Sequence, residues 1–301
     1  MRIDLPQRDL HLECESHGDT RHPTVILIMG LGLQLVSWPQ ALIDALVAAG
    51  YRVVVFDNRD IGLSSSGPLP KYTPPSLALL AHLLHRHFTP PYRIADMAAD
   101  TLALADALHL DRFHVVGISL GGMIGQSLAA RAPERVSSLT SMMSNAGPRT
   151  APWPSPAMLW HFLQRPPKNA DFDGRLDHFV ALMQALGHVS DADELAALRE
   201  RLARSLRRSY NPAGAARHLM AVIADPDRSD EVARIRCPTL IIHGADDPLI
   251  PLPAAYHLAR LLPQARLEVI PRLGHYLPAA ALPELTRMII EQLRSAQTTR
   301  H

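Results

Sequence analysis

Ser119 is the residue whose type and setting best fit covalent chemistry. It is the centre of the pentapeptide GISLG at 117–121, which follows the apolar run FHVV and precedes the helical stretch GMIGQSLAARAPE. This G-x-S-x-G pattern between a strand and a helix is typical of a serine nucleophile on a turn too tight for flanking side chains. The alternative is a glycine-rich turn that serves only the fold. A phosphate-binding loop is excluded because the Gly-Lys-Ser/Thr ending is absent.

A serine hydroxyl needs a general base, and the chain offers sixteen histidines. His275 is the best candidate because it follows the last predicted strand, where a loop at the carboxyl edge of a sheet can reach Ser119. The rival cluster is His82, His85 and His87, which indicates a metal site at first sight. It lacks a carboxylate or cysteine at a known ligand spacing, so we expect these to be solvated histidines and no metal to be bound.

The acid that orients the histidine is expected in a loop close to it. Asp246 and Asp247 follow the predicted strand at 238–244, whereas the strand predicted at 136–144 ends in Ser144-Asn145 and offers no carboxylate. The residues alone leave the choice between the two aspartates open. The triad then runs Ser, Asp, His along the chain, an order that differs from those of chymotrypsin and subtilisin.

These segments together carry a family resemblance. GISLGG, HGADDPLIP and RLGHYLP resemble the α/β-hydrolase superfamily, and VILIMGLGLQLVSWP followed by FDNRDIGLSS resembles the branch that contains aclacinomycin methylesterase. The matching segments span about Val25 to Pro278. In that family the acid is the fourth residue of G-x-x-D-x-x-x-P, which begins here at Gly244, so the resemblance implies Asp247 as the acid and Asp246 as its neighbour in the loop.

The resemblance also implies an oxyanion hole made of two backbone N–H groups. One belongs to Leu120, directly after the nucleophile, and the other to Leu31, after the first long strand. Met29 stands where many members of the superfamily have a histidine. Because the donors are backbone groups, this departure changes how the loop is held and leaves the hole itself intact.

Apolar runs alternating with helical periodicity predict an α/β fold: an α/β-hydrolase fold with a mostly parallel, eight-stranded sheet, helices on both faces and an inserted helical cap. The predicted buried strands are residues 24–30, 51–57, 113–119, 136–144, 238–244 and 265–271. Helices are expected at 39–50, 94–110, 253–261 and 282–294, with a short helix at 76–85 and an antiparallel edge hairpin at 9–19.

The alternation stops after Gly147 and only helical periodicity follows until about residue 224. We therefore predict a core domain at 1–147 and 230–301 and a helical cap, or lid, at 148–229. The cap is expected to control substrate choice through an apolar pocket. Its candidate lining residues are Trp153, Trp160, Phe162, Phe172 and Phe179.

Several other residues are expected to serve the fold rather than the chemistry. Asp57, Arg59 and Asp60 are predicted to form an ion-paired scaffold, and the basic run from Arg199 to Arg208 is predicted to be the solvated face of an amphipathic helix. Trp38, Met123, Met142 and Met143 are candidates for an acyl pocket, although such residues near strands are more often core.

The composition excludes several classes of function. Thirty Lys and Arg balance 29 Asp and Glu, for a net charge of +1, so no global field attracts nucleic acid or anionic membranes. No stretch approaches about 18 apolar residues, and the first residues lack the apolar segment of a signal peptide. Cys14 and Cys237 are too few for a disulfide scaffold, so we expect a cytoplasmic protein.

These features predict a serine hydrolase that cleaves a small-molecule carboxylic ester through an acyl-serine, as a carboxylesterase or methyl esterase that needs no cofactor. The same triad also suits a carbon–carbon bond hydrolase, a lactonase, a thioesterase or a perhydrolase. A non-catalytic ligand-binding protein on this scaffold is the alternative from another class, and the intact triad argues against it. The oligomeric state is left open.

Overall fold

The protein is built on a single sheet, as a computed structural model shows. The structure describes residues 1–84, 86–147, 152, 154–164, 166–167, 169–187, 189 and 191–298. The strands are β1 (Arg2–Leu5), β2 (Leu10–His17), β3 (Thr24–Ile28), β4 (Arg52–Phe56), β5 (Phe113–Ile118), β6 (Val136–Met142), β7 (Thr239–Gly244) and β8 (Arg266–Ile270). They form an eight-stranded sheet in the order β1-β2-β4-β3-β5-β6-β7-β8.

The strands from β4 to β8 pair in parallel, and only the pairs β1·β2 and β2·β4 are antiparallel. The predicted α/β-hydrolase fold with a mostly parallel sheet is therefore confirmed. The edge hairpin is placed differently from the prediction. The segment from Asp9 supplies one interior strand, β2, and the edge strand is β1, which begins at Arg2. The four residues of β1 alternate, with Arg2 and Asp4 exposed and Ile3 and Leu5 turned inward, but so short a run was not separated from the strand that follows it.

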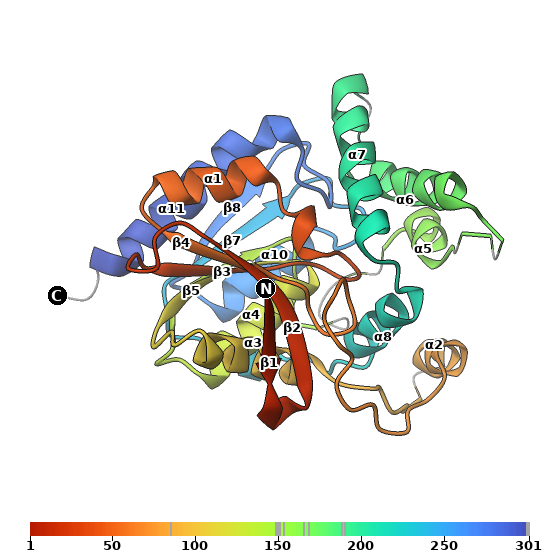
Figure 1. Ribbon diagram of the computed structural model, residues 1–301, viewed down its shortest axis with the longest axis horizontal. Coiled ribbons are helices and arrows are strands. Elements are labelled where there is room, and N and C mark those ends of the chain that lie inside the picture. Colours follow the sequence, from red (N-terminus) through yellow and green to blue (C-terminus); the bar gives the residue numbers. More distant parts are fainter. Residues whose placement is uncertain are drawn as a thin grey trace.

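Helices cover both faces of the sheet (Figure 1). Side chains alternate across β3, so Val25 and Leu27 join one buried cluster while Ile26 and Ile28 join the other. The first cluster contains α1 (Gln40–Ala48) and α11 (Leu282–Thr298). The second contains α3 (Ile94–Ala107), α4 (Leu120–Arg131) and α10 (Pro253–Leu261). Burial on both faces explains why these strands are continuous apolar runs.

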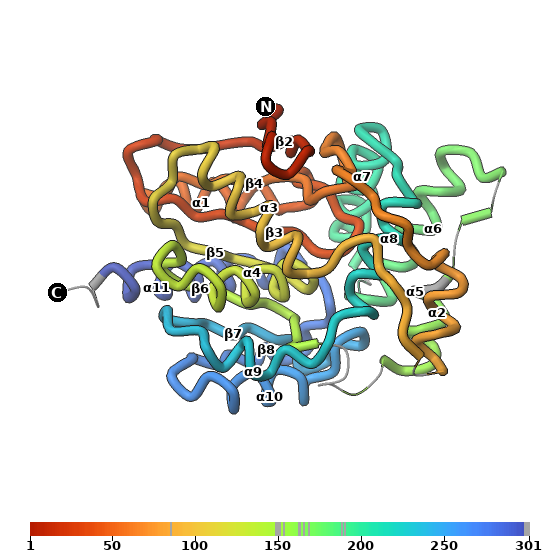
Figure 2. The backbone as a smooth tube through the Cα atoms, turned by 90° about the horizontal axis from the view of Figure 1, so that it is seen from below, coloured from red at the N-terminus to blue at the C-terminus, as the bar shows by residue number. Residues whose placement is uncertain are grey.

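Between β6 and β7 the described residues form helices and no strand. These are α5 (Pro156–Leu163), α6 (Phe172–Gly187), α7 (Ala192–Arg208) and α8 (Pro212–Ile223), followed by the short α9 (Ser229–Val232). We call α5 to α8 the insert helices. They gather on one side of the molecule, with α2 (Pro75–Leu83) beside α8, in both views (Figures 1 and 2).

Both ends of this segment meet at one place on the core. The Arg228 N–H donates to the Ala146 carbonyl at 2.8 Å, and a methyl group on Gly147 would overlap the Pro226 carbonyl. The chain thus leaves the core and returns to it at neighbouring positions, as an inserted segment must. In the described part of the chain, no helix is long and apolar enough to cross a membrane.

Candidate active site

Ser119 occupies a strained turn between β5 and α4. Its backbone has φ 55° and ψ −119°, an unusual conformation for a residue with a side chain. The turn is anchored because the Ser119 N–H donates to the Met142 carbonyl at 2.8 Å and the Ser144 hydroxyl donates to the Ser119 carbonyl at 2.9 Å. The side chain is half-buried, which keeps its oxygen within reach of a ligand.

The two glycines that flank Ser119 are sterically required. A methyl group on Gly117 would overlap the Gly121 carbonyl, and one on Gly121 would overlap the Ile28 carbonyl of β3. Strand, turn and helix therefore approach each other more closely than any Cβ allows, as the G-x-S-x-G pattern predicted.

We expect Gly121→Ala to destabilise the protein by about 3 kcal/mol or more, because the overlapping atoms are backbone and cannot move aside. Urea denaturation measures the loss. Gly174→Ala, also on a helix, is the matched control, since its new methyl group would meet only the movable Asp171 side chain and the Ala170 methyl at 3.2 and 3.5 Å. Equal midpoints for wild type and Gly121→Ala would show that the turn is not tight.

Asp247 and His275 are in direct contact. His275 Nδ1 lies 2.7 Å from Asp247 Oδ2, while Asp247 Oδ1 accepts the N–H groups of Leu249 and Ile250 at 2.9 and 2.8 Å. The Asp247 side chain is fully buried. Burial alone would raise the pKa of Asp247, but His275 and these hydrogen bonds hold it below its ordinary value. The carboxylate is therefore ionised at neutral pH, and His275 carries its proton on Nδ1 with Nε2 free to act as a base.

The other residues of these two loops have supporting positions. Asp246, the alternative acid, has an exposed side chain, and its backbone N–H donates to the Leu273 carbonyl. His243 lies behind Asp247, with Nε2 3.7 Å from Oδ2 and hydrogen-bonded to the Ile250 carbonyl at 2.8 Å. Burial lowers the pKa of His243, so it is a neutral neighbour of the acid.

Ser119, Asp247 and His275 all follow parallel strands, β5, β7 and β8, and so lie at the same edge of the sheet. Backbone hydrogen bonds connect the strand ends, from Met143 to Ile242 and from Ala245 to Ile270. The sequence-predicted residues are thus gathered at one edge, with the acid and base in contact.

The loop after β3 runs beside the nucleophile. A methyl group on Gly30 would lie 3.4 Å from Ser119 Cβ and 4.0 Å from its Oγ, so the backbone that carries Leu31 N–H is next to Ser119. Asn58 Nδ2 donates to the Met29 carbonyl at 3.1 Å, and the Met29 side chain is core. Asn58 therefore helps to hold the loop at Met29, the position where many members of the superfamily have a histidine. Leu120, the other predicted donor, begins α4, where a backbone N–H has no partner within the helix.

Comparison with known proteins decides the family. Residues 23–279 match the alpha/beta hydrolase fold family. The chain belongs to this α/β-hydrolase family. It is 32% identical to rhodomycin D methylesterase of Streptomyces peucetius over 96% of both chains, and 31% identical to a putative carbamate hydrolase of Caulobacter sp. (strain K31) over 87% of both. The solved enol-lactonase from Burkholderia xenovorans LB400 shares the fold, with a TM-score of 0.69 and 22% identity over 95% of this chain and 97% of that one.

In this α/β-hydrolase the insert helices contact the loop that carries His275. The His275 N–H donates to the Leu186 carbonyl of α6 at 2.7 Å. On α7, the Glu194 carboxylate accepts the Tyr276 hydroxyl at 2.5 Å and the Ala279 N–H at 2.9 Å. The position of the histidine loop therefore depends on two insert helices.

Ion pairs connect the loop after β4 to the insert. Asp57 pairs with Arg208 at 2.6 Å and Asp60 with Arg217 at 2.6 Å, and both carboxylates are fully buried. Arg59 binds Asp100 of α3. The scaffold predicted for Asp57, Arg59 and Asp60 is confirmed.

The basic run on α7 was predicted to be a solvated face, and this is wrong for two of its arginines. The Arg208 side chain is only 16% exposed because it meets Asp57, and that of Arg201 is 23% exposed beside Glu194. Arg204 and Arg207 are exposed as predicted. An arginine on a helix that docks against a buried carboxylate becomes buried as its ion-pair partner. The spacing of the leucines on the helix does not reveal such a partner.

The pocket residues proposed from sequence have mixed positions. Trp38, Met123, Met142 and Met143 are buried core. Trp160 and Phe172 are exposed, and Phe179 packs with the insert's own core, so these three do not enclose a pocket. Trp153 and the Phe162 side chain lie outside the described residues.

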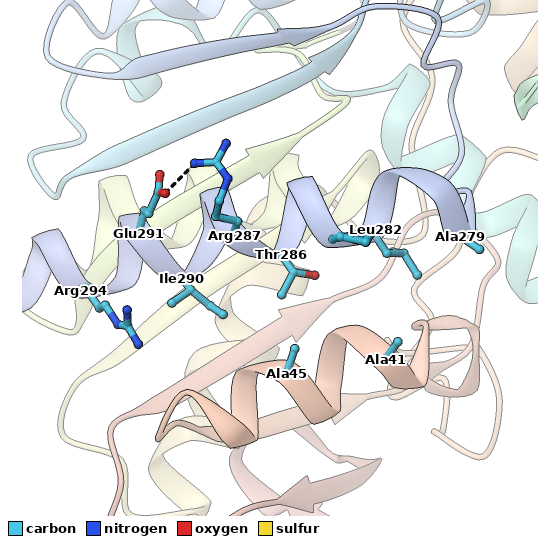
Figure 3. Close-up of a pocket in the computed structure, with 10 residues that line it drawn as sticks. Ala41, Ala45, Ala279, Leu282, Thr286, Arg287, Ile290, Glu291 and Arg294 are labelled. Atoms are coloured by element: carbon cyan, nitrogen blue, oxygen red, sulfur yellow. Dashed lines mark hydrogen bonds and ion pairs between the residues drawn. The ribbon is translucent and has the colours of Figure 1, made fainter.

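Two further features are separate from the site. No group of three or more metal-binding side chains gathers among the residues the structure describes, which exclude His85. A groove of about 680 Å³ lies between α1 and α11, lined by alanines and aliphatic side chains beside the Arg287–Glu291 pair (Figure 3). None of its lining residues belongs to the candidate triad or to the loop after β3.

His218, on α8, is not among the sequence-predicted site residues, but its ring contacts the loop after β3 through Gly32. A local signal existed. Gly214, His218 and Ala221 recur at four and three residues on a helix, and all are buried, so His218 lies on the inward face. His218 was not selected from the sixteen histidines of the chain because it lies outside every motif.

Proposed function

We propose that Ser119, His275 and Asp247 are the catalytic triad of a carboxylic ester hydrolase, with the N–H groups of Leu31 and Leu120 as its oxyanion hole. The observation that carries this is the 2.7 Å contact between His275 Nδ1 and a fully buried Asp247, at the same sheet edge as the strained Ser119 turn. The substrate is a small-molecule ester, because the relatives at 32% identity over 96% of the chain are methylesterases.

The geometry supports the usual sequence of proton transfers. Ser119 Oγ attacks the ester carbonyl carbon and its proton passes to His275 Nε2, while the carbonyl oxygen becomes an oxyanion that Leu31 and Leu120 bind. The carbon–oxygen bond to the alcohol then breaks, and Nε2 returns the proton to that oxygen. Water attacks the acyl-serine with the same base, which releases the acid and restores Ser119.

We further propose that residues 148–229 form a cap over the carboxyl ends of the strands. Three contacts support this, because each joins an insert helix to a loop that follows a parallel strand: His275 to Leu186, Asp57 to Arg208, and Gly32 to His218. Such a layer excludes water and contacts the part of the ester away from the scissile bond.

A substrate panel tests the function. We expect hydrolysis of short- and medium-chain nitrophenyl esters and of methyl esters, with methanol release as the assay for the methyl esters. The value of kcat/KM should be about 100-fold or more above that for a carbamate, a lactone and a vinylogous diketone. An open-chain ester releases a separate alcohol that can leave the site, whereas the alkoxide of an opened lactone stays tethered to the acyl group. A carbamate carbonyl is less electrophilic because nitrogen donates electron density to it, and the diketone requires a carbon leaving group. A higher value for any of the three other classes would replace the ester proposal with that class.

A further inference from the structure

The N–H of Leu31 can stabilise an oxyanion only if its peptide unit is held in one orientation. Three hydrogen bonds orient three successive peptides of this loop. The Met29 carbonyl accepts from Asn58, the Gly30 carbonyl accepts the Leu33 N–H at 3.3 Å, and the Gly32 N–H donates to His218 Nδ1 at 3.3 Å. In a trans peptide the N–H and C=O point in opposite directions, so anchoring the Gly30 carbonyl also directs the Leu31 N–H.

His218 is the anchor that the insert supplies, and its neighbours define its protonation. The Gly32 N–H can only donate, so Nδ1 must be unprotonated. The Arg59 carbonyl, 2.8 Å from Nε2, can only accept, so Nε2 must carry the hydrogen. The ring is therefore the neutral Nε2–H tautomer, and a second proton would remove the acceptor that Gly32 uses.

The surroundings keep the ring neutral and fixed. His218 is fully buried, and burial lowers its pKa to about 4. The charged groups around it are Arg59 and Asp60 from the loop after β4 and Arg217 from its own helix, and the Tyr92 ring packs edge-on at 6.3 Å. Arg217 and Tyr92 both bind the Asp60 carboxylate, at 2.6 Å each. The residues that surround the His218 ring are therefore fixed by bonds to one another.

We propose that His218 is a positioning residue of the oxyanion hole: its neutral imidazole fixes Gly32 and, through it, the Leu31 N–H beside Ser119. This inference rests on the proposed function. It means that the insert contributes to the rate of the chemical step as well as to substrate fit, because one of its helices holds part of the loop that binds the developing charge.

A matched pair of variants tests the contact. Asn and Leu have the same branching, but His218→Asn places an amide oxygen near the position of Nδ1, where it can accept from Gly32, and His218→Leu places a methyl group there. For His218→Leu we expect kcat on a nitrophenyl ester to fall about ten- to a hundredfold with KM changed less than about threefold. His218→Asn is expected to keep at least about fivefold more of kcat than His218→Leu.

A second measurement separates positioning from general destabilisation. A trifluoromethyl ketone forms an oxyanion adduct with a catalytic serine, whereas the matching methyl ketone mimics only the ground state. His218→Leu should lower the affinity for the trifluoromethyl ketone by the same factor as it lowers kcat/KM. The affinity for the methyl ketone should stay unchanged. Met220→Leu, buried on the same helix, conserves volume and should match wild type in both assays.

The outcomes distinguish the two proposals. If a fluorophosphonate fails to label Ser119 in wild type, the proposed function is wrong. If wild type is labelled and active but a folded His218→Leu keeps its kcat, or both variants lose the same amount, His218 is a structural core residue only. If His218→Leu does not fold, His218→Gln takes its place, because its longer side chain carries the amide beyond the Nδ1 position, and the same loss in kcat is expected.

Discussion

Ser119→Ala is expected to lower ester turnover by about 10⁴- to 10⁶-fold, because loss of the nucleophile leaves only the oxyanion hole and substrate binding. The fold should survive, since the anchoring bonds of the turn come from the backbone of Ser119 and alanine keeps its Cβ. Steady-state kinetics on a nitrophenyl ester measure the loss. A fluorophosphonate should label Ser119 alone in wild type, as read by peptide mapping.

Ser127→Ala is the matched control for this variant. Ser127 lies on α4, the helix that follows Ser119, and its buried hydroxyl donates to Glu231 at 2.9 Å rather than toward the sheet edge. Its turnover should stay within a fewfold of wild type. Labelling of Ser127 or Ser144, or full activity in Ser119→Ala, would refute the assignment of the nucleophile.

Asp247→Asn is expected to reduce kcat by about 10⁴-fold, because it changes the tautomer of His275. Asp247 Oδ1 accepts two backbone N–H groups, so the asparagine oxygen should stay there and its NH₂ group should face His275 Nδ1. An NH₂ group can only donate, so Nδ1 would become the acceptor and the ring hydrogen would move to Nε2. The base would then point a proton at Ser119.

Asp246→Asn makes the same chemical change one residue earlier, at an exposed side chain, and should alter kcat less than about threefold. Both variants should keep their unfolding midpoints close enough to wild type for the kinetics to be compared. If Asp246→Asn were the more damaging of the two, the acid would be Asp246 and the site would have to be rebuilt in that register.

The insert helices bear on both rate and specificity. Remote contacts in an apolar pocket discriminate between substrates by only about 1–3 kcal/mol per methylene. In contrast, His218 and Glu194 contact the two loops that carry the proposed oxyanion donor and the proposed base. We therefore expect substitutions in the insert to separate into those that reorder substrates and those that lower kcat for all of them.

The sequence by itself determined most of the sheet and the candidate nucleophile, since both leave local signals. A strand covered on both faces must be a continuous apolar run, and β3, β4, β5 and β7 were each predicted to within two residues at either end. The Ser119 turn requires glycines at fixed positions because backbone atoms from β3 and α4 occupy the space of a side chain. Such constraints act within a few residues and are visible in one chain.

Only the tertiary structure decided which charged and polar side chains meet. Asp246 and Asp247 are equivalent by spacing, and the family pattern alone separated them. In the folded loop one carboxylate is turned inward to His275 while the other is exposed. Arg208 and His218 join residues 151 and 186 positions away, respectively. Periodicity gives the inward face of a helix, but the partner of each residue on that face depends on how the whole helix docks against the core, which no local pattern encodes.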